Sequence, residues 1–473
     1  MQFSVQAVMA GLSLRHVEWV LSLLGEWFGF DAPDFTSVRL WVQRVGLYLW
    51  QRTRPHADDW IWLVDHVAEA GGGKCLVIVG VRRSWLCGGD FVLQHSDVIL
   101  LYAEVMDGST GAGMHRILKD LARVVGVPVQ IVSDHGSDVL KGARLFQAEH
   151  PATLLTWDMT HRLARLLLAA VKDDEAWSAF RAACQRTRTA VQRTPWSPMS
   201  PPSTTGASRC EHIDTLALWG EQTLAALDGG GHAVLDGAHG WDEAAAAELH
   251  GVLPAPDRQR LDAALLGQSF ADAASFRTAV RSVLGASDHE AAIARAADQG
   301  LRRCRAHLGW LEQYRPLLRD ECVPLVRMTY SAEKQVKHAG LHGASAAEWR
   351  ASQPPLARSQ TRARKFRASL LRYLREEGGR RPRTEALLGT TDVLESLFGK
   401  YKRYTERSPV KELNSAILTL PVATEPITRE LVDKAIVSTP IKSLTRWVRT
   451  TFDRTSLALQ RLVYASPPGT EAA

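Results

Sequence analysis

Apolar residues recur at the three-to-four-residue spacing of amphipathic helices over the first fifty positions. Residues 12–29 follow this pattern, with Ser13 suited to cap the helix and Gly29 suited to end it. A short link leads to a second helical pattern at residues 36–49. Its polar positions include three side chains able to contact DNA: Arg39, Gln43 and Arg44. The pair is typical of a helix-turn-helix, although two amphipathic helices also serve often as plain packing units.

Short apolar runs replace the helical spacing after Asp58 and predict β-strands. Three runs follow one another at residues 60–67, 74–82 and 97–105, with Gly71–Gly73 forming the first turn. Helices and strands then alternate, as helix 113–125, strand 129–136, helix 137–150, strand 152–158 and helix 159–171. Three meandering strands followed by parallel additions predict an α/β fold with helices on both faces of a mixed sheet. This order is the ribonuclease-H-like layout.

The strand signal ends near residue 172, and helical patterns rich in Ala, Leu, Arg and Glu fill the chain as far as residue 385. A large all-helical insertion into the sheet core is the simplest account of this change. We therefore expect four regions: N-terminal DNA-binding helices (1–55), the first part of the core (56–171), the helical insertion (172–385), and the rest of the core with C-terminal helices (386–473).

A basic stretch lies near the end of the expected insertion. Residues 358–383 contain ten arginines and lysines against two glutamates. Three of these cations are candidate DNA contacts: Arg364, Lys365 and Arg367. The stretch is either the solvated face of a helix or a row of contacts to DNA phosphates, and the sequence leaves both interpretations open.

Two aspartates stand where the predicted sheet would bring them together. Asp65 lies within the first apolar strand, where an unpaired carboxylate is costly to bury. Asp134 ends the fourth strand, which neighbours the first strand in this layout. Adjacent carboxylates raise each other's pKa unless a cation neutralises them, and oxygen ligands favour Mg²⁺ or Mn²⁺. The alternatives are a buried structural role for Asp65, a helix cap at Asp134, and Asp138 as the acid that carries the function.

A third acid is expected from a helix packed beside these strands. The segment 390–404 begins with Thr390 or Thr391 as a cap and places Glu395 on one face with Gly399, which permits close approach. Two other acids compete for this role: Glu385 and Asp392. Basic residues on the same helix are suited to phosphate contact: Lys400, Lys402 and Arg403. Three acids around two metal ions would serve DNA hydrolysis and attack by a DNA 3′-hydroxyl alike.

Asp158 and His161 form a further polar cluster at the end of the fifth predicted strand. Asp158 is placed to cap the helix that follows, and His161 to orient a ligand or contact DNA. The plainer interpretation, a capped helix with a packed histidine, is the favoured one.

Composition narrows the class of protein without fixing it. The formal net charge is +6 and the isoelectric point about 9.0, which suits a polyanionic partner but does not require one. The six cysteines form no CxxC pair. No apolar run reaches the length of a membrane span, and charged residues interrupt the first thirty positions. We therefore expect a cytoplasmic protein without a membrane partner.

These segments resemble a family of bacterial transposases with a DDE catalytic triad. The matching segments are DWIWLVDHV, GGGKCLVIVGVR, PVQIVSDHGSDVLKG, TWDMTHRLARLLL and TTDVLESLFGKYK. The resemblance implies a ribonuclease-H-like nuclease whose triad is Asp65, Asp134 and Glu395. The interval of 261 positions between the last two acids (395 minus 134) is similar to the hAT-type arrangement, in which a helical domain interrupts the core.

The resemblance also implies partners. They are two Mg²⁺ or Mn²⁺ ions, double-stranded DNA as transposon ends and as target, and a second copy of the chain in a homodimer or larger oligomer at the nucleoid. Two other functions stay open: a nuclease of the same core that performs no strand transfer, and a transposase-derived DNA-binding regulator. The intact set of three acids weighs against the regulator.

Overall fold

The computed structural model of the chain divides into two compact units. The first unit comprises residues 1–162, 333–348 and 374–473, and the second comprises 163–332 and 349–373. The N-terminal helices therefore belong with the sheet and the C-terminal helices, and residues 333–348 belong with the sheet and not with the expected insertion. The structure describes residues 1–68, 73–86, 90–193, 197–205, 208, 210–230, 239–240, 243–270, 273–285, 289–297, 305–405, 412–452 and 463–464.

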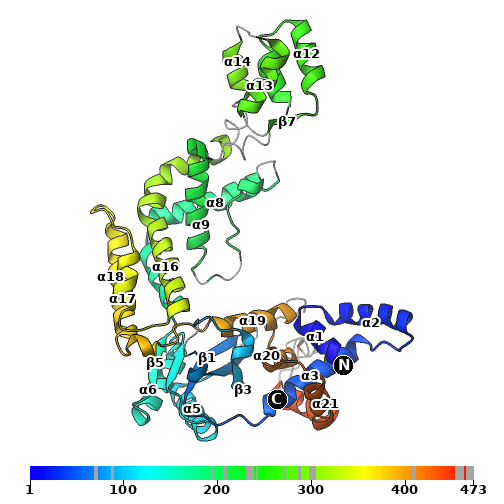
Figure 1. Cartoon of the computed structure of the whole chain (residues 1–473), viewed down its shortest axis with the longest axis vertical. Helices are drawn as coiled ribbons and strands as arrows, with labels where there is room; N and C mark the ends of the chain where they lie inside the picture. The colour runs from blue at the N-terminus through cyan, green and yellow to red at the C-terminus, as the bar shows by residue number, and fades with distance from the viewer. Residues whose placement is uncertain are drawn as a thin grey trace. The chain divides into compact units, whose positions relative to one another are not determined.

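A five-stranded mixed sheet forms the centre of the first unit, as the alternating apolar runs predict (Figure 1). The strand order is β3-β2-β1-β4-β5, with antiparallel pairing along β3-β2-β1 and parallel pairing along β1-β4-β5. The strands are β1 (Trp60–Ala68), β2 (Lys74–Arg82), β3 (Ile99–Met106), β4 (Gln130–Ser133) and β5 (Leu154–Trp157). Gly71 and Gly72 of the expected first turn lie outside the described residues.

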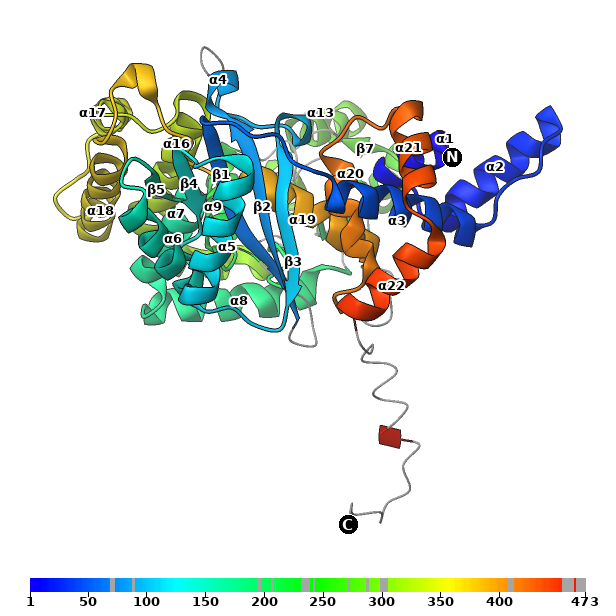
Figure 2. The same ribbon diagram turned by 90° about the horizontal axis from the view of Figure 1, so that it is seen from below.

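The two faces of the sheet carry different helices because side chains alternate along each strand. Trp60, Trp62 and Val64 of β1 pack with α5 (Gly111–Val125) and α6 (Ser137–Glu149). Ile61 and Leu63 pack instead with α19 (Asp392–Thr405). Figure 2 shows α5 and α19 on opposite sides of the sheet. The near-continuous apolar run of β1 thus reflects burial on both faces.

The fourth strand is shorter than its apolar run suggests. β4 ends at Ser133, and the chain turns at once, because His135 takes the left-handed backbone conformation with a φ of 59°. Asp134 therefore lies in the turn before α6 and not within the strand. Short helical segments complete this part of the first unit: α4 (Arg83–Leu86), η1 (His95–Asp97) and η6 (Arg383–Glu385).

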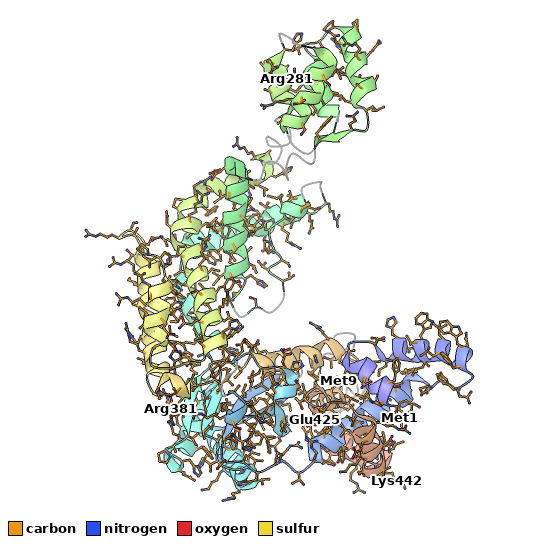
Figure 3. All side chains as sticks on the ribbon, viewed as in Figure 1. Met1, Met9, Arg281, Arg381, Glu425 and Lys442 are labelled. Atoms are coloured by element: carbon orange, nitrogen blue, oxygen red, sulfur yellow. The ribbon has the colours of Figure 1, made fainter. Side chains whose placement is uncertain are left out.

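The N-terminal helices pack on the C-terminal ones in a core of their own. α2 begins after the cap Ser13, whose hydroxyl accepts from the His16 backbone N–H at 3.2 Å, and ends at Gly29 with a φ of 71°. Gln6 donates to the backbone oxygen of Ile427. Figure 3 labels Met9 at the end of the same helix and Glu425 just before Ile427. The helices are α1 (Gln2–Met9), α2 (Leu14–Phe28), α3 (Phe35–Gln51), η7 (Ser415–Leu418), α20 (Thr419–Ala423), α21 (Arg429–Ser438) and α22 (Ile441–Thr451).

Two of the three side chains expected to contact DNA on α3 have partners inside the first unit. Gln43 donates to the Ser415 hydroxyl at 2.8 Å, and Arg44 donates to the backbone oxygens of Ile436 and, at 2.7 Å, of Thr439. Arg44 thus satisfies carbonyl groups at the C-terminal end of α21. Arg39 is exposed. The helix-turn-helix function of this region stays a prediction, with Arg39 as its accessible contact.

The second unit is helical over its described residues apart from the short pair β6 (His239–Gly240) and β7 (Ser269–Phe270). Leu261, Phe276 and Ile293 centre one of its cores. Its elements, some of which continue into the first unit, are α7 (Met159–Val171), α8 (Glu175–Val191), η2 (Ser197–Met199), α9 (Ile213–Ala225), η3 (Ala226–Gly230), α11 (Glu243–His250), α12 (Ala255–Leu265), α13 (Ala273–Leu284), α14 (Glu290–Ala297), η4 (Gly309–Tyr314), η5 (Leu317–Cys322), α16 (Val323–Ala339), α17 (Ser345–Ser352) and α18 (Thr361–Gly378).

Most of the basic stretch 358–383 forms α18. Some of its cations pair with groups of the protein, and others are exposed. Arg362 pairs with Asp174 and Glu321, and Arg367 donates to a backbone oxygen, that of Pro354, at 3.3 Å. The other two expected DNA contacts are exposed: Arg364 and Lys365. Within the described part of the chain, no helix combines the length and the apolar character needed to cross a membrane.

We predict that the absence of a side chain at Gly46 is essential for the close packing of α3 against η7. A Cβ at Gly46 would lie 2.1 Å from the backbone oxygen of Leu418, whereas one at Gly399 on α19 would meet nothing within 4 Å. Gly46→Ala should therefore destabilise the protein by about 1–3 kcal/mol in urea unfolding. The control Gly399→Ala should stabilise it by about 0.5–1 kcal/mol, because alanine favours the helix. Equal effects of the two substitutions would contradict this packing.

Candidate active site

Asp65 and Asp134 lie side by side at one edge of the sheet. β1 and β4 are parallel neighbours, and Val64 stands in register with Ser133. Asp65 directly follows Val64, and Asp134 directly follows Ser133. The two carboxylates therefore lie at the same level of two adjacent strands. Asp65 follows Leu63 by two positions and therefore faces the side of the sheet that α19 covers.

The backbone around each aspartate fixes its carboxylate. The His66 backbone N–H donates to the Oδ1 atom of Asp65 at 2.6 Å. The Gly136 N–H donates to the Oδ1 atom of Asp134 at 2.8 Å, which closes the turn after β4. The ring of His135 stacks on Trp157 with centroids 4.7 Å apart, and this contact holds the turn against the end of β5.

Asp65 ionises with difficulty. Burial is the main cause, and the neighbouring charge of Asp134 adds to it, so that the pKa of Asp65 rises to about 7. The backbone hydrogen bond from His66 and the positive field of His161 act in the opposite direction but do not cancel the effect. The pair is therefore relieved either by a proton on Asp65 or by a positive charge beside it.

Asp158 is the most deeply buried acid of the site, with no exposed surface. One carboxylate oxygen accepts from the His161 backbone N–H at 2.7 Å and so caps α7, as the sequence predicts. The other oxygen accepts from the Thr391 N–H at 2.6 Å and from its hydroxyl at 2.5 Å. Burial opposes ionisation, but the hydrogen bonds from His161 and Thr391 outweigh it and hold the pKa of Asp158 below its ordinary value.

The same carboxylate therefore fixes the start of α19 and the side chain of His161. The Nδ1 atom of His161 lies 3.2 Å from Asp158, and its Nε2 atom lies 3.6 Å from the Oε1 atom of Glu395. Glu395 stands in the first turn of α19, four positions after the fixed Thr391. His161 thus contacts Glu395, and its charge also acts on Asp65.

The chain that returns to the sheet before α19 is held by backbone contacts. The Gln130 side chain donates to the Leu388 oxygen at 2.7 Å and accepts from the Leu388 N–H at 3.2 Å. The Met159 N–H donates to the Gly389 oxygen at 2.8 Å. These bonds join residues far apart in sequence to the ends of β4 and β5, and they set the position from which α19 begins.

The competing acids have other partners. Asp138 accepts from the hydroxyl of Ser109 and from Lys74 at 2.9 Å, and these contacts outweigh burial and keep its pKa well below the usual range. Glu385 pairs with Arg381 at 3.0 Å and with Arg83 at 3.6 Å. Asp392 pairs with Lys337 at 2.7 Å. Each rival acid is thus neutralised by a cation, whereas the field of Asp134 acts to raise the pKa of Asp65.

A pocket of about 310 Å³ opens beside α19. The His95 Nε2 atom lies 3.0 Å from the Ser396 hydroxyl at its wall, one residue beyond Glu395. Its lining residues are Phe91, Val92, Leu93, Gln94, His95, Lys337, Thr390, Asp392, Val393 and Ser396. Sequence reasoning missed this pocket and the Thr391–Asp158 link, because their parts come from segments hundreds of positions apart.

Basic side chains continue along the exposed side of α19. Lys402 lies seven positions, about two turns, after Glu395 and so stands on the same side of the helix. Lys400 and Arg403 are also exposed. The pKa of Lys400 is lowered by its partial desolvation and by the neighbouring charge of Arg403. Lys402 and Arg403 thus stand on or near the side of α19 that carries Glu395, whereas Lys400, five positions after Glu395, stands away from it.

The donor set fits a hard divalent cation. Among the described residues, no three His, Cys, Asp or Glu side chains are already drawn together as a metal-binding group. The adjacent carboxylates of Asp65 and Asp134 nevertheless supply oxygen ligands of the type that Mg²⁺ prefers. The raised pKa of Asp65 is the expected signature of a carboxyl pair that a cation would relieve.

Asp65 and Asp158 should affect stability in opposite directions. Because the folded-state pKa of Asp65 is about 7 against an ordinary 3.8, its ionisation disfavours folding progressively as the pH rises between these values. Asp65→Asn should then be more stable than wild type at pH 8 without divalent metal, by on the order of 2 kcal/mol, and equal to it near pH 4. Urea unfolding across this pH range measures the difference.

Asp158→Asn is the matched control. A lowered pKa means that the Asp158 carboxylate stabilises the fold at neutral pH and loses this effect as the pH falls through its folded-state pKa. The variant should be destabilised at pH 7 by about 3 kcal/mol, with a smaller deficit in acid. A loss of stability in Asp65→Asn at pH 8 would show that the electrostatics of the site differ from those described.

No protein-family model matches this chain, and no curated protein sequence matches it.

Proposed function

We propose that this protein is a DNA transposase in which Asp65, Asp134 and Glu395 form the catalytic triad. One observation carries the proposal. Two carboxylates leave adjacent parallel strands side by side, and a glutamate in the first turn of α19 approaches them across His161. A pair of aspartates on adjacent strands, with a glutamate from a distant segment linked to it through His161, is unusual as a purely structural feature, because uncompensated carboxylates are costly to bury.

The arrangement of the strands supports the same proposal. Three antiparallel strands followed by two parallel ones, in the order β3-β2-β1-β4-β5, agree with a ribonuclease-H-like core. The second unit supplies most of the interval between Asp134 and Glu395 and is helical in its described parts, which agrees with a helical interruption of the hAT type. A resemblance in strand order alone does not determine function, so the proposal depends on the residues of the site.

Each residue of the site has a defined part in the proposed reaction. Asp65, Asp134 and Glu395 would hold two divalent ions, which when bound activate the attacking oxygen and neutralise the leaving oxygen of a phosphodiester. His161 holds the carboxylate of Glu395, and Asp158 fixes the position of His161. The same ligands serve a water molecule or a DNA 3′-hydroxyl as nucleophile. No covalent bond between protein and DNA is required.

Double-stranded DNA is the proposed partner. Lys400, Lys402 and Arg403 extend a basic surface away from the acids along α19. Phosphate contacts of this kind position the duplex without reading its sequence. Exposed Arg364 and Lys365 of α18 and exposed Arg39 of α3 are proposed as further contacts, which bind the transposon ends and the target.

Cleavage assays with single-residue variants test the triad. The substrate is linear DNA that carries the flanks of the native locus, incubated with Mg²⁺ or Mn²⁺. Asp65→Ala, Asp134→Ala and Glu395→Ala should reduce cleavage to background while retaining DNA binding. His161→Ala should retain some activity, reduced by roughly 10–100-fold as for a residue that orients a metal ligand. Cleavage by wild type in EDTA would contradict the proposal.

Variants of the competing acids are the matched controls for this assay. Glu385→Ala and Asp392→Ala should cleave at rates close to wild type, because each acid is paired with a cation away from the aspartate pair. Undiminished cleavage by Glu395→Ala would remove Glu395 from the triad. Joining of cut ends to a second DNA distinguishes a transposase from a nuclease that performs hydrolysis alone.

Lys402 should act on DNA and not on the fold. Lys402→Ala should weaken DNA binding and cleavage, and should reduce the slope of log K against log salt by about 1, because one phosphate contact is lost. Its unfolding free energy should stay within about 0.5 kcal/mol of wild type, as expected for an exposed side chain. Lys434→Ala on α21, also exposed, is the control and should change neither property. An unchanged salt slope in Lys402→Ala would exclude this contact.

A further inference from the structure

Large aromatic side chains stand exposed on and just beyond α2. Trp19 is 61% exposed, Trp27 72% and Phe28 74%, and Phe30 after the helix is 44% exposed. Single exposed apolar residues are ordinary, but several neighbouring aromatics on one surface element mark an interaction site. Trp19 and Trp27 share one side of α2; we call them the α2 aromatic surface, and they lie outside the candidate active site.

The helical pattern explains why these side chains are exposed. α2 buries Val17, Leu21 and Gly25 against the rest of the first unit. Trp19 and Trp27 lie on the other side of the helix, with half-buried Leu23 midway between them. Figure 2 shows α2 extending outward from the helices on which it packs. The inner apolar face is therefore satisfied, and the outer face adds nothing to the folding of this unit.

The spacing of the outer face is symmetric about one residue. Trp19 precedes Leu23 by four positions, and Trp27 follows it by four. In an antiparallel pair of identical helices that cross at Leu23, Trp19 of each copy meets Trp27 of the other. Such a contact is isologous, which is the rule for twofold dimers. Because the same residues face one another when two identical helices run antiparallel, this pattern favours a second copy of this chain over an unrelated partner.

The charges around the surface agree with this occupant. Arg15 stands near the start of α2, where Glu18 is also present, whereas Glu26 and Asp31 stand near its end. An antiparallel arrangement centred on Leu23 places Arg15, eight positions before it, beside Asp31 of the other copy, eight positions after it, and also pairs the two helix dipoles favourably. The same acids would repel DNA phosphates and anionic lipid headgroups.

The exposed area is sufficient for a weak, reversible contact. An aromatic side chain buries about 150–250 Å² when covered, so Trp19 and Trp27 at these exposures offer roughly 300 Å² per copy. Two copies would together bury roughly 600 Å² through these side chains, which is the size range of a transient interface. We propose that two copies of this chain associate through antiparallel contact of their α2 aromatic surfaces, centred on Leu23.

Sedimentation of the full chain tests the proposal. Wild type should sediment as a dimer at tens of micromolar, and the double variant Trp19→Ser with Trp27→Ser should sediment as a monomer. The variant should unfold at the same urea concentration as wild type, because both side chains are already exposed. Trp85→Ser on α4, a tryptophan 56% exposed, is the matched control and should remain dimeric. A monomeric wild type, or a double variant that still dimerises, would overturn the proposal.

Cross-linking locates the twofold axis. Leu23→Cys should form a disulfide-linked dimer under mild oxidation, because the axis brings the two substituted positions together. Lys434→Cys, on the exposed side of α21, should give no such product above the wild-type background. Absence of the Leu23→Cys dimer from a protein that sediments as a dimer would place the interface elsewhere. Binding of monomeric wild type to neutral phospholipid vesicles, lost in the double tryptophan variant, would identify a lipid surface instead and overturn the proposal.

Discussion

The geometry of the candidate site depends on the buried carboxylate of Asp158. A charged group without exposed surface is costly unless hydrogen bonds replace its lost hydration. Here the His161 backbone, the Thr391 backbone and the Thr391 hydroxyl supply those bonds, and the His161 ring lies beside them. Because the donors belong to two different helices, neither helix can shift without breaking bonds to this carboxylate. The position of Glu395 follows from that constraint, since Glu395 is one turn into the second helix.

Asp65 shows the opposite balance, although burial disfavours the ionisation of both side chains. It receives a backbone hydrogen bond from His66 but faces the negative charge of Asp134, and its pKa rises to about 7. The pKa of Asp158 falls because its donors outweigh its burial. Two acids within one site thus differ in the number of hydrogen-bond donors that each receives. Asp158 stabilises the fold, whereas Asp65 keeps an unsatisfied need for a cation, which is typical of functional positions.

The sequence predicts the sheet well because strand periodicity is a local property. Neighbouring residues are enough to predict the strand from Trp60 to Val67 and the helix cap at Ser13. Both predictions agree with the structure. The adjacency of Asp65 and Asp134 also follows once the strand order is assumed. Contacts without local signals were missed. Nothing near Thr391 indicates that it donates to Asp158, 233 positions earlier in the chain, and nothing near Gln43 indicates a partner in Ser415.

The long interval between Asp134 and Glu395 need not loosen the site. The chain leaves the first unit after residue 162 and finally returns to it at residue 374. On its return, the Leu388 backbone bonds to the Gln130 side chain, and the Gly389 oxygen accepts from Met159. These bonds lie within the first unit, so the start of α19 is set by the ends of β4 and β5. Loop closure costs grow only slowly with length. The helical segment between the two acids can therefore vary in size while the start of α19 stays under the control of the sheet.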